Sequence, residues 1–370
     1  CMHGRRPPVT GPATDILIFG TGAFAERILL DIAATAAESM SVVIAGRNAE
    51  RLEWLRLAAN ARAAIFGRPV RVAMRRVDLS STSNAADAIG ELEPAVVVQA
   101  ASAQTSSVIS SQGNAWSRLV AEGGLSATAV FNALISIRVA EAIKETRPDV
   151  RLVNCCYADV VNSLIAARGL PITCGVGNVA ILWAAFSGEL GLRQPGPLKV
   201  LAHYQTITPF RHPAAERKGP APRVWIDDVE IADVFPRFAS VKLTTAPVIE
   251  ISGANGVPLM LAMAKGRDCR AHVPGPKGLP GGYPVAFRGG RLDLDLPPNI
   301  SKEEAIRWNA RFEEENGMTV DADGQVRYNG VLYDRLRAVS PTLSNGFHVR
   351  DLETVFAAME ALRAQLLTRS

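Results

Sequence analysis

A glycine turn near the start of the chain constrains its fold more than any other feature. Residues 16–19 form a short apolar run that predicts a buried strand, and an amphipathic helical pattern follows directly after the turn. Gly20, Gly22 and Ala25 fill the G-x-G-x-x-G/A spacing between the two. Gly20 permits the tight turn, Gly22 lets a pyrophosphate approach the backbone, and Ala25 lets the helix pack closely. Because the free N–H groups of that helix would face an anion, the turn predicts a dinucleotide site, with a purely structural turn as the alternative.

The segments that follow continue the alternation of strand and helix. Expected strands cover residues 41–45, 70–77, 95–100, 151–155 and 171–174, and expected helices cover residues 49–64, 85–92, 129–145 and 159–168. This alternation is typical of a doubly wound parallel sheet. The sequence therefore predicts an α/β fold with a dinucleotide-binding Rossmann domain over residues 14–195.

The composition changes after about residue 195, where Pro- and Gly-rich loops at 209–222 and 274–282 separate short apolar segments. Strands are expected at residues 198–207, 224–231, 240–243 and 259–264, a helix from Ser301 through Glu315, and a hairpin over 319–333. We predict a flexible leader over residues 1–13, an α+β substrate domain over 196–346 and a C-terminal helix over 347–370. That helix either packs back on the first domain or forms the seam of a homodimer.

The end of the second strand bears on the choice of cofactor. An NAD site usually has Asp or Glu there to hold the ribose hydroxyls, whereas this sequence has Arg47 and Asn48, with Arg51 one turn later. A guanidinium suits a 2′-phosphate, so the sequence favours NADP over NAD. The alternative is that both arginines are solvated residues at a helix start.

The other cofactor contacts are expected at the ends of the third and fourth strands. Asp78 and Leu79 are expected beside the adenine, and the small residues after the fourth strand under the nicotinamide. The predicted cofactor-binding residues are Gly20, Thr21, Gly22, Ala23, Phe24, Ala25, Arg47, Asn48, Arg51, Asp78, Leu79, Ala100, Ala101 and Ser102. The Ser-rich segment 104–124 is expected to be either a mobile loop over the substrate or a plain connector.

Two families resemble parts of this sequence. The Gly20-Thr21-Gly22 turn, together with Arg47 in its Ala-Gly-Arg-Asn context, resembles the NADP-binding domain of the saccharopine-dehydrogenase-like reductases. Residues 132–192 resemble the lactate and malate dehydrogenases, through the Leu-Val-Asn-Cys-Cys-Tyr-Ala-Asp segment at 152–159, Gly-Leu-Pro at 169–171 and Gly-Glu-Leu-Gly-Leu at 188–192. Both resemblances imply a Rossmann fold and a nicotinamide-dependent dehydrogenase.

The departures from the lactate and malate dehydrogenases concern the substrate. Cys156 stands where the family has an Asn that contacts cofactor and substrate, and the Asp and Arg expected on the helix after Gly177 are absent. The family's catalytic His falls near His203, but without its Glu-His-Gly context. The resemblance does not imply lactate or malate as substrate, because the arginine that would clamp a 2-oxo-acid carboxylate is missing.

A dehydrogenase must position the acceptor and exchange one proton, since the cofactor performs the hydride transfer. His203 is the first candidate for that proton, followed by Tyr204 and Tyr157. The predicted substrate-contacting residues are Asn178, Arg211 and His212. The alternatives are a hydrogen-bonded or surface role for His203 and a turn role for Asn178.

The cysteines at 155, 156 and 174 are interpreted as small buried apolar residues, and no metal is predicted. A zinc site formed with His203 is the minor alternative. Asp159 begins an expected helix and is interpreted as its N-cap.

Composition limits the remaining classes of function. The net charge of +4 is spread along the chain, which favours neither nucleic acid nor a membrane surface as a partner. No uninterrupted apolar run reaches the roughly 18 residues of a spanning helix, and the five cysteines lack C-x-x-C spacing, which fits a reduced cytoplasm. We predict a cytoplasmic NAD(P)-dependent oxidoreductase for a small polar carbonyl or imine, with a non-catalytic NADP-binding sensor or scaffold as the alternative.

Overall fold

The first half of the chain forms a six-stranded parallel sheet. The computed structural model describes residues 14–105, 107–108, 111–193 and 196–369, so the predicted leader lies outside the described residues. The strands are β1 (Thr14–Phe19), β2 (Met40–Gly46), β3 (Val70–Arg76), β4 (Pro94–Gln99), β5 (Arg151–Asn154) and β6 (Cys174–Gly175). Their order is β3-β2-β1-β4-β5-β6, and β1 pairs in parallel with both β2 and β4. This is the strand order of the doubly wound dinucleotide-binding sheet, which confirms the predicted fold class.

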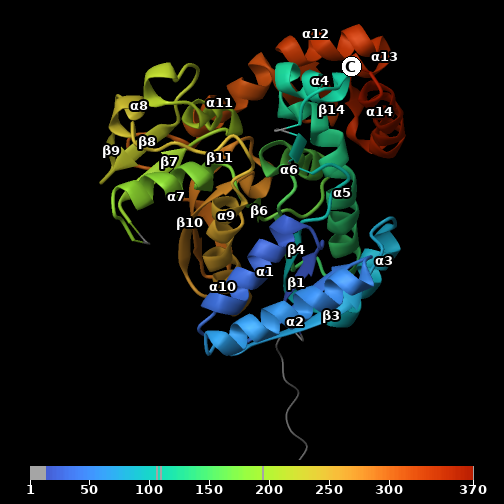
Figure 1. Ribbon diagram of the computed structural model, residues 1–370, viewed down its shortest axis with the longest axis vertical. Helices are drawn as coiled ribbons and strands as arrows, with labels where there is room; N and C mark the ends of the chain where they lie inside the picture. The colour runs from blue at the N-terminus through green and yellow to red at the C-terminus, as the bar shows by residue number, and fades with distance from the viewer. Residues whose placement is uncertain (1–13, 106, 109–110, 194–195, 370) are drawn as a thin grey trace, which may run out of the picture.

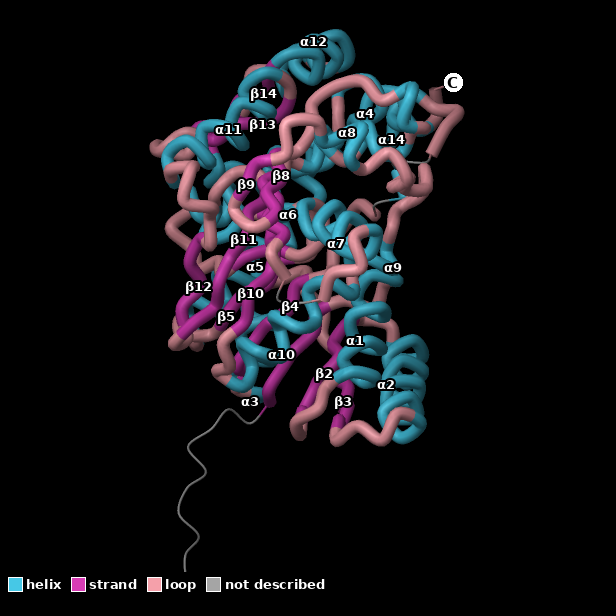
Figure 2. The backbone as a smooth tube through the Cα atoms, turned by 90° about the vertical axis from the view of Figure 1, so that its left-hand side faces the viewer, coloured by secondary structure: helices cyan, strands magenta, loops and turns pink. Residues whose placement is uncertain are grey.

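Helices cover both faces of this sheet (Figure 1). They are α1 (Ala23–Thr35), α2 (Ala49–Ile65), α3 (Thr82–Leu92), α5 (Ala129–Thr146) and α6 (Ala158–Ala167). Successive residues of a strand point to opposite faces, so Ile16 and Ile18 join the core under α1 and α2, whereas Leu17 and Phe19 join the core under α3 and α5. Figure 2 shows α1 and α2 lying together beside β2 and β3. Burial on both faces explains why the strands read as continuous apolar runs.

Part of the predicted loop at 104–124 is a helix, so that prediction is wrong over α4 (Ala115–Gly123). The side chain of Asn114 accepts from the backbone N–H of Ser117, and Ser117 completes the capping box. Trp116 is only 2% exposed and packs edge-on against Phe131, with ring centroids 5.6 Å apart. The Ser-rich composition favoured a loop, although Trp116, Leu119 and Val120 recur at helical spacing and form a buried apolar face.

A helical stretch of 22 residues, Leu125–Thr146, is long and apolar enough to cross a membrane by length and composition alone. Asn132 and Ser136 interrupt its apolar residues, so the stretch contains no continuous apolar run of that length. In the protein, 83% of its most apolar window is buried, as in the central helix of a folded core.

The second half of the chain adds three small antiparallel sheets. They comprise β7 (Leu198–Leu201), β8 (Arg223–Ile226) and β9 (Val229–Glu230); β10 (Cys269–Pro274), β11 (Gly282–Arg288) and β12 (Arg291–Leu294); and β13 (Gly317–Val320), β14 (Gln325–Asn329) and β15 (Phe347–His348). The helices among them are α7 (Val179–Glu189), α8 (Val234–Arg237), α9 (Ile249–Ser252), α10 (Val257–Lys265), α11 (Lys302–Glu315), α12 (Gly330–Val339) and α13 (Pro341–Ser344). The cap at Ser301 and the hairpin turn at Gly324 are confirmed, but the hairpin ends at Asn329, and residues 330–333 begin α12 instead. The strands β10, β11 and β12 were not predicted.

Two of the predicted strands in this half are wrong. Of the other two, the strand predicted at 198–207 ends at Leu201, and residues 224–231 form the two short strands β8 and β9. Residues 259–264 belong to α10, where Leu259, Met260 and Met263 are buried at helical spacing and Gly266 ends the helix in the left-handed conformation. This helix joins the core beneath β1 and β4. Residues 240–243 form no strand; Leu243 is held by its N–H donating to the Phe210 carbonyl, 2.8 Å away.

The closing helix, α14 (Leu352–Leu367), packs back on the first half of the chain rather than standing free. Met359 and Leu362 lie in the same core as Phe131, and Arg138 of α5 pairs with Glu353 at 2.6 Å. The helix begins later than predicted because residues 347–348 pair with β14 as β15. Since α10 and α14 both pack against the Rossmann half, the division into domains at residue 195 stays a prediction.

Candidate active site

The glycine turn between β1 and α1 is wedged against the end of β4. Gly20 has φ +121°, and a Cβ there would lie 2.9 Å from the carbonyl carbon of Ala100. Its N–H donates to the Ala45 carbonyl at 2.9 Å, and the N–H of Ala100 donates to the Phe19 carbonyl at 2.8 Å. Only glycine satisfies both the dihedral angle and the close approach.

Gly22 differs from Gly20 because a Cβ at this position would meet no protein atom within 4 Å. It is the N-cap of α1, with φ −75° and no side-chain cap, so the backbone N–H groups of the first turn are left for another acceptor. Gly22 and Ala23 are exposed, whereas Ala25 is buried against the sheet. These residues fit the cradle that a dinucleotide pyrophosphate requires.

Of the three polar residues predicted to bind the cofactor after β2, Asn48 and Arg51 make contacts within the protein, whereas Arg47 is exposed. The Asn48 side chain caps α2 by accepting from the N–H of Arg51 at 3.0 Å. Arg51 is tied to the glycine turn, because its Nη2 lies 2.6 Å from Glu26 Oε2 and its Nε donates to the Thr21 carbonyl at 3.3 Å. Arg47 is exposed at the strand end. Of the two arginines, Arg47 is therefore the more available for a 2′-phosphate.

The remaining predicted cofactor residues also lie at the carboxyl edge of the sheet. Asp78 is exposed and accepts from the N–H of Ser80, whereas Leu79 is 6% exposed and packs in the core. Ala100, Ala101 and Ser102 are half-buried just after β4. Their contact with a cofactor stays a prediction.

All three residues predicted as proton donors meet in one buried group, which we call the His203–Glu313 cluster: His203, Glu313, Ser126, Tyr157 and Tyr204. Nε2 of His203 lies 3.2 Å from Oε1 of Glu313. The other carboxylate oxygen, Oε2, accepts from Ser126 Oγ at 2.7 Å and from the N–H of Met318 at 2.6 Å. Because Ser126 donates to the carboxylate, it accepts from the Tyr157 hydroxyl, 2.7 Å away.

The surroundings of His203 define which nitrogen carries its proton. The N–H of Gln205 donates to Nδ1 at 3.3 Å, so Nδ1 is an acceptor and the neutral ring bears hydrogen on Nε2, facing Glu313. The ring stacks on Phe312 with centroids 4.8 Å apart. Burial raises the pKa of both Tyr157 and Tyr204, which keeps their hydroxyls protonated.

Asp159 is not the N-cap that its position suggested, because α6 begins one residue earlier and Tyr157, with φ 50°, is its N-cap. The Asp159 side chain points inward and is 1% exposed. Its Oδ2 accepts from the Asn178 side chain, whereas Oδ1 has no hydrogen-bond partner among the described residues. Burial raises the pKa of this carboxyl and outweighs the lowering effects of His203 and of the Asn178 hydrogen bond.

A cavity of about 300 Å³ opens beside these two carboxylates. It lies between α6, α11 and β13, and its lining residues include Asp159, Ser163, Glu313 and Thr319. Its volume matches the lower end of small-molecule sites. The cluster thus borders a space in which a small substrate fits.

Other predicted site residues lie apart from this cluster. Arg211 donates through Nη1 to the carbonyls of Thr244 and Ala246, the latter at 2.8 Å, and His212 is exposed. Their substrate role stays a prediction. The described residues contain no group of three or more His, Cys, Asp or Glu side chains placed to hold a metal, and Cys156 is buried with its pKa raised to about 12 by burial.

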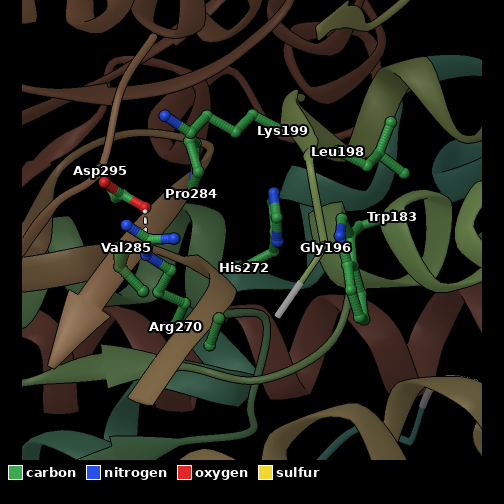
Figure 3. Close-up of a pocket in the computed structure, with 10 residues that line it drawn as sticks. Trp183, Gly196, Leu198, Lys199, Arg270, His272, Pro284, Val285 and Asp295 are labelled. Carbon is green, nitrogen blue, oxygen red and sulfur yellow. Dashed lines mark ion pairs between the residues drawn. The ribbon is translucent and has the colours of Figure 1, made fainter. Parts of the chain in front are cut away.

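A second cavity is lined by His272, which with His203 is one of the two buried histidines among the described residues (Figure 3). There His272 stacks on Trp183 at 5.2 Å, and Arg270 pairs with Asp295 at 3.2 Å. Its volume of about 30 Å³ accommodates only a water molecule or two. The N–H of Val200 donates to Nε2 of His272 at 3.0 Å, so this histidine has a structural partner.

Sequence reasoning missed three members of the site: Glu313, Ser126 and the inward-facing Asp159. Glu313 is one of three consecutive glutamates on an otherwise polar helix, and nothing local distinguishes it from its exposed neighbours. The one available signal was its spacing of four from Asn309 and eight from Ala305, which places it on the buried face of α11.

The fold can be compared with solved structures. The chain superposes with a TM-score of 0.50 on lactate dehydrogenase from Eimeria maxima (12% identity, 83% of this chain and 95% of that one) and on malate dehydrogenases from Salinibacter ruber (16%, 80% and 94%) and Picrophilus torridus (15%, 80% and 94%). The chain has the fold of the lactate and malate dehydrogenases. No protein-family model and no curated protein sequence matches it.

Within that fold the side chains of this region differ from those implied by the sequence resemblance. Asn178 follows β6 and donates to Asp159. The arginine expected on the following helix, α7, is absent from its sequence. At these identities the likeness is one of fold.

Proposed function

We propose that this protein is an NAD(P)-dependent oxidoreductase that transfers a hydride between nicotinamide and a small polar carbonyl or imine substrate. The observation that carries the proposal is the glycine turn. Gly20 packs against the residue that follows β4, whereas a Cβ on Gly22 would meet no protein atom, so a pyrophosphate has room there. The lactate dehydrogenase from Eimeria maxima, which has the same fold, was solved with NADH and oxamate. That precedent supports a nicotinamide cofactor for this chain.

A bound nicotinamide would supply or accept the hydride. The chain's own residues would exchange the proton, and the His203–Glu313 cluster is suited to do so. Glu313 borders the cavity, and its Oε1 lies 3.2 Å from Nε2 of His203. The two atoms are within reach of each other but not aligned as a hydrogen bond, so proton transfer to a substrate would need a small rotation of one side chain. Ser126 and the Met318 N–H fix the carboxylate by holding its other oxygen.

The presence of such a cluster favours an enzyme over the alternative of a non-catalytic sensor or scaffold. A sensor needs neither a buried acid–base pair nor a cavity beside it. Burying His203 at 0% exposure and Glu313 at 5% costs free energy. Such costs are typical of functional sites.

The preferred form of the cofactor within this proposal is NADP. It rests on the exposed Arg47 at the end of β2, in a context that resembles the saccharopine-dehydrogenase-like reductases. That resemblance also supports an imine as the reacting group. NAD is the second choice.

Titration of the purified protein with NADPH and NADH, followed by nicotinamide fluorescence, tests the proposal. We expect tight binding of NADPH and weaker binding of NADH. If neither cofactor binds, the glycine turn has no cofactor role and the enzyme assignment falls. A positive result is followed by a turnover screen of oxo acids with and without amines.

We also propose that the protein works in the cytoplasm as a homodimer, without nucleic acid or membrane partners. Cys155, Cys156, Cys174 and Cys269 are free, which suits a reducing compartment. Trp54 and Leu57 on α2 are each more than half exposed, as expected of an interface. Light scattering of the eluted protein measures the oligomeric state.

A further inference from the structure

The cavity beside the His203–Glu313 cluster has a marked charge bias. Among the described residues that line it, none is a lysine or an arginine, and four are acidic. The four are Asp159, Glu313, Glu314 and Asp321. The Asp321 side chain forms an ion pair within the neighbouring hairpin, where its Oδ2 lies 3.0 Å from Nη1 of Arg327. Asp159 and Glu313 are the two most buried, at 1% and 4% exposed.

These two carboxylates are under-satisfied. Asp159 Oδ1 has no hydrogen-bond partner among the described residues, and Glu313 Oε1 faces only His203, at 3.2 Å without the alignment of a hydrogen bond. Both residues are more than nine-tenths buried and both line the cavity. A buried acceptor without a donor costs free energy unless something donates to it.

The local charge balance shows what kind of donor is missing. Even a protonated His203 supplies one positive charge to the two buried carboxylates, so this part of the cavity remains negative when both are ionised. Apart from Glu314 and Asp321, the other lining residues are apolar or neutral, as at Val160, Ala310 and Met318. An anionic substrate would be repelled there, whereas an ammonium or guanidinium group would donate to Asp159 and Glu313 and keep its alkyl stem on the apolar walls.

We propose that this cavity binds the cationic group of an amine- or guanidinium-bearing substrate, with Asp159 and Glu313 as the recognising carboxylates. The inference deepens the proposed function and rests on it for the identity of the ligand as a substrate. Among small polar carbonyl and imine substrates, the acidic cavity favours those that bear an amine or a guanidinium.

Calorimetric titration of the full-length protein with n-butylamine and agmatine, and with n-butanol and butyrate as the uncharged and anionic counterparts, tests the cavity. We expect both cations to bind at least about tenfold more tightly than n-butanol, and butyrate not to bind. Equal binding of n-butanol, or tighter binding of butyrate, would overturn the proposal.

Three variants locate the binding. Glu313→Gln should weaken n-butylamine binding about tenfold or more by removing one charge. Ala310→Leu should abolish binding by filling the cavity while leaving both carboxylates in place. Asp334→Asn, at an exposed position of α12, is the matched control and should bind as the wild type does. Unchanged binding in Ala310→Leu would show that the cations bind elsewhere.

An NADPH titration of the same samples separates the two proposals. If NADPH binds and the cations do not, the substrate class is wrong and the oxidoreductase proposal stands. If the cations bind and NADPH does not, the cavity assignment stands and the oxidoreductase proposal falls.

Discussion

Nε2 of His203 lies 3.2 Å from Oε1 of Glu313, and the two side chains are 0% and 5% exposed. Residues from distant parts of the chain, one after β7 and one on α11, thus form an acid–base pair in the interior. Ser126 and the backbone of Met318 hold the far side of the carboxylate. The pair is therefore built to keep its geometry, which acid–base catalysis requires.

Replacing His203 by Gln should lower turnover by about 100-fold or more, because proton transfer by a positioned side chain contributes that much. The affinity for NADPH should not change, since His203 lies outside the glycine turn. Steady-state kinetics over a range of pH, with NADPH titration alongside, measure both effects. His348→Gln, at a hairpin position where the ring faces the Asp323 carbonyl, is the control. A His203→Gln enzyme with the wild-type rate and pH profile would exclude His203 from proton transfer.

The two glycines of the turn should respond differently to substitution. Gly22→Asp should fold with stability close to that of the wild type, because the Cβ has space and φ −75° suits any residue, but it should lose NADPH binding through charge repulsion with the pyrophosphate. Gly20→Ala should instead destabilise the fold, since its Cβ would meet the Ala100 carbonyl at 2.9 Å. Thermal melts and cofactor titration distinguish the two. Full NADPH affinity in Gly22→Asp would remove the pyrophosphate site from this turn.

Arg47 and Arg51 can be separated in the same way. Arg47→Ala should weaken NADPH binding about tenfold or more while changing NADH binding little, because a 2′-phosphate loses a charge-assisted partner. Arg51→Ala removes the contact with Glu26 at 2.6 Å and should affect both cofactors alike, through the position of the turn. Fluorescence titration of both variants with both cofactors gives the ratios. Equal losses of NADPH and NADH in Arg47→Ala would refute the 2′-phosphate role.

His272 predicts sensitivity of the fold to acid. Burial, and after it the charge of Lys199, lowers the pKa of His272 to about 3, from 6.5 in the unfolded chain. The unfolded state then binds the proton first, so stability is lost as the pH falls below 6.5 towards 3. Between pH 7 and pH 5 this amounts to about 2 kcal/mol at 1.4 kcal/mol per pH unit. His272→Gln, measured by urea denaturation at both pH values, should lack this share of the loss; an identical pH dependence would contradict it.

The parallel sheet could be predicted from the sequence, because its strands are buried on both faces and therefore appear as continuous apolar runs between the helices. The sequence was insufficient for α10, because the six apolar residues Leu-Met-Leu-Ala-Met-Ala fit a strand as well as a helix and only Pro258 and Gly266 signal the helix. The glycine turn is a local motif and was identified. The cavity is not a local motif, since Asp159 on α6 and Glu313 on α11 come together only through the packing of these helices with β13.

Asp159 is a buried carboxyl that should lower the stability of the fold at neutral pH. Burial raises the pKa of its carboxyl, so the folded state disfavours the charged form. The cost is absent below the unfolded value of 3.8, grows as the pH rises through that value towards the raised folded pKa, and is fully present above it. Asp159→Asn removes the charge and keeps an oxygen for the Asn178 amide. We therefore expect Asp159→Asn to be more stable than the wild type at pH 7, by about 1 kcal/mol, and no more stable at pH 3.

The same substitution should lower turnover and n-butylamine affinity, because it removes the charge of one of the two buried acidic residues that line the cavity. Urea denaturation at the two pH values, with calorimetric titration at pH 7, measures both effects on one sample. A gain in stability combined with a loss of binding is what a strained functional carboxylate produces. If Asp159→Asn instead destabilises the protein at pH 7, then Oδ1 has a partner that stabilises the charge, and Asp159 is a structural residue.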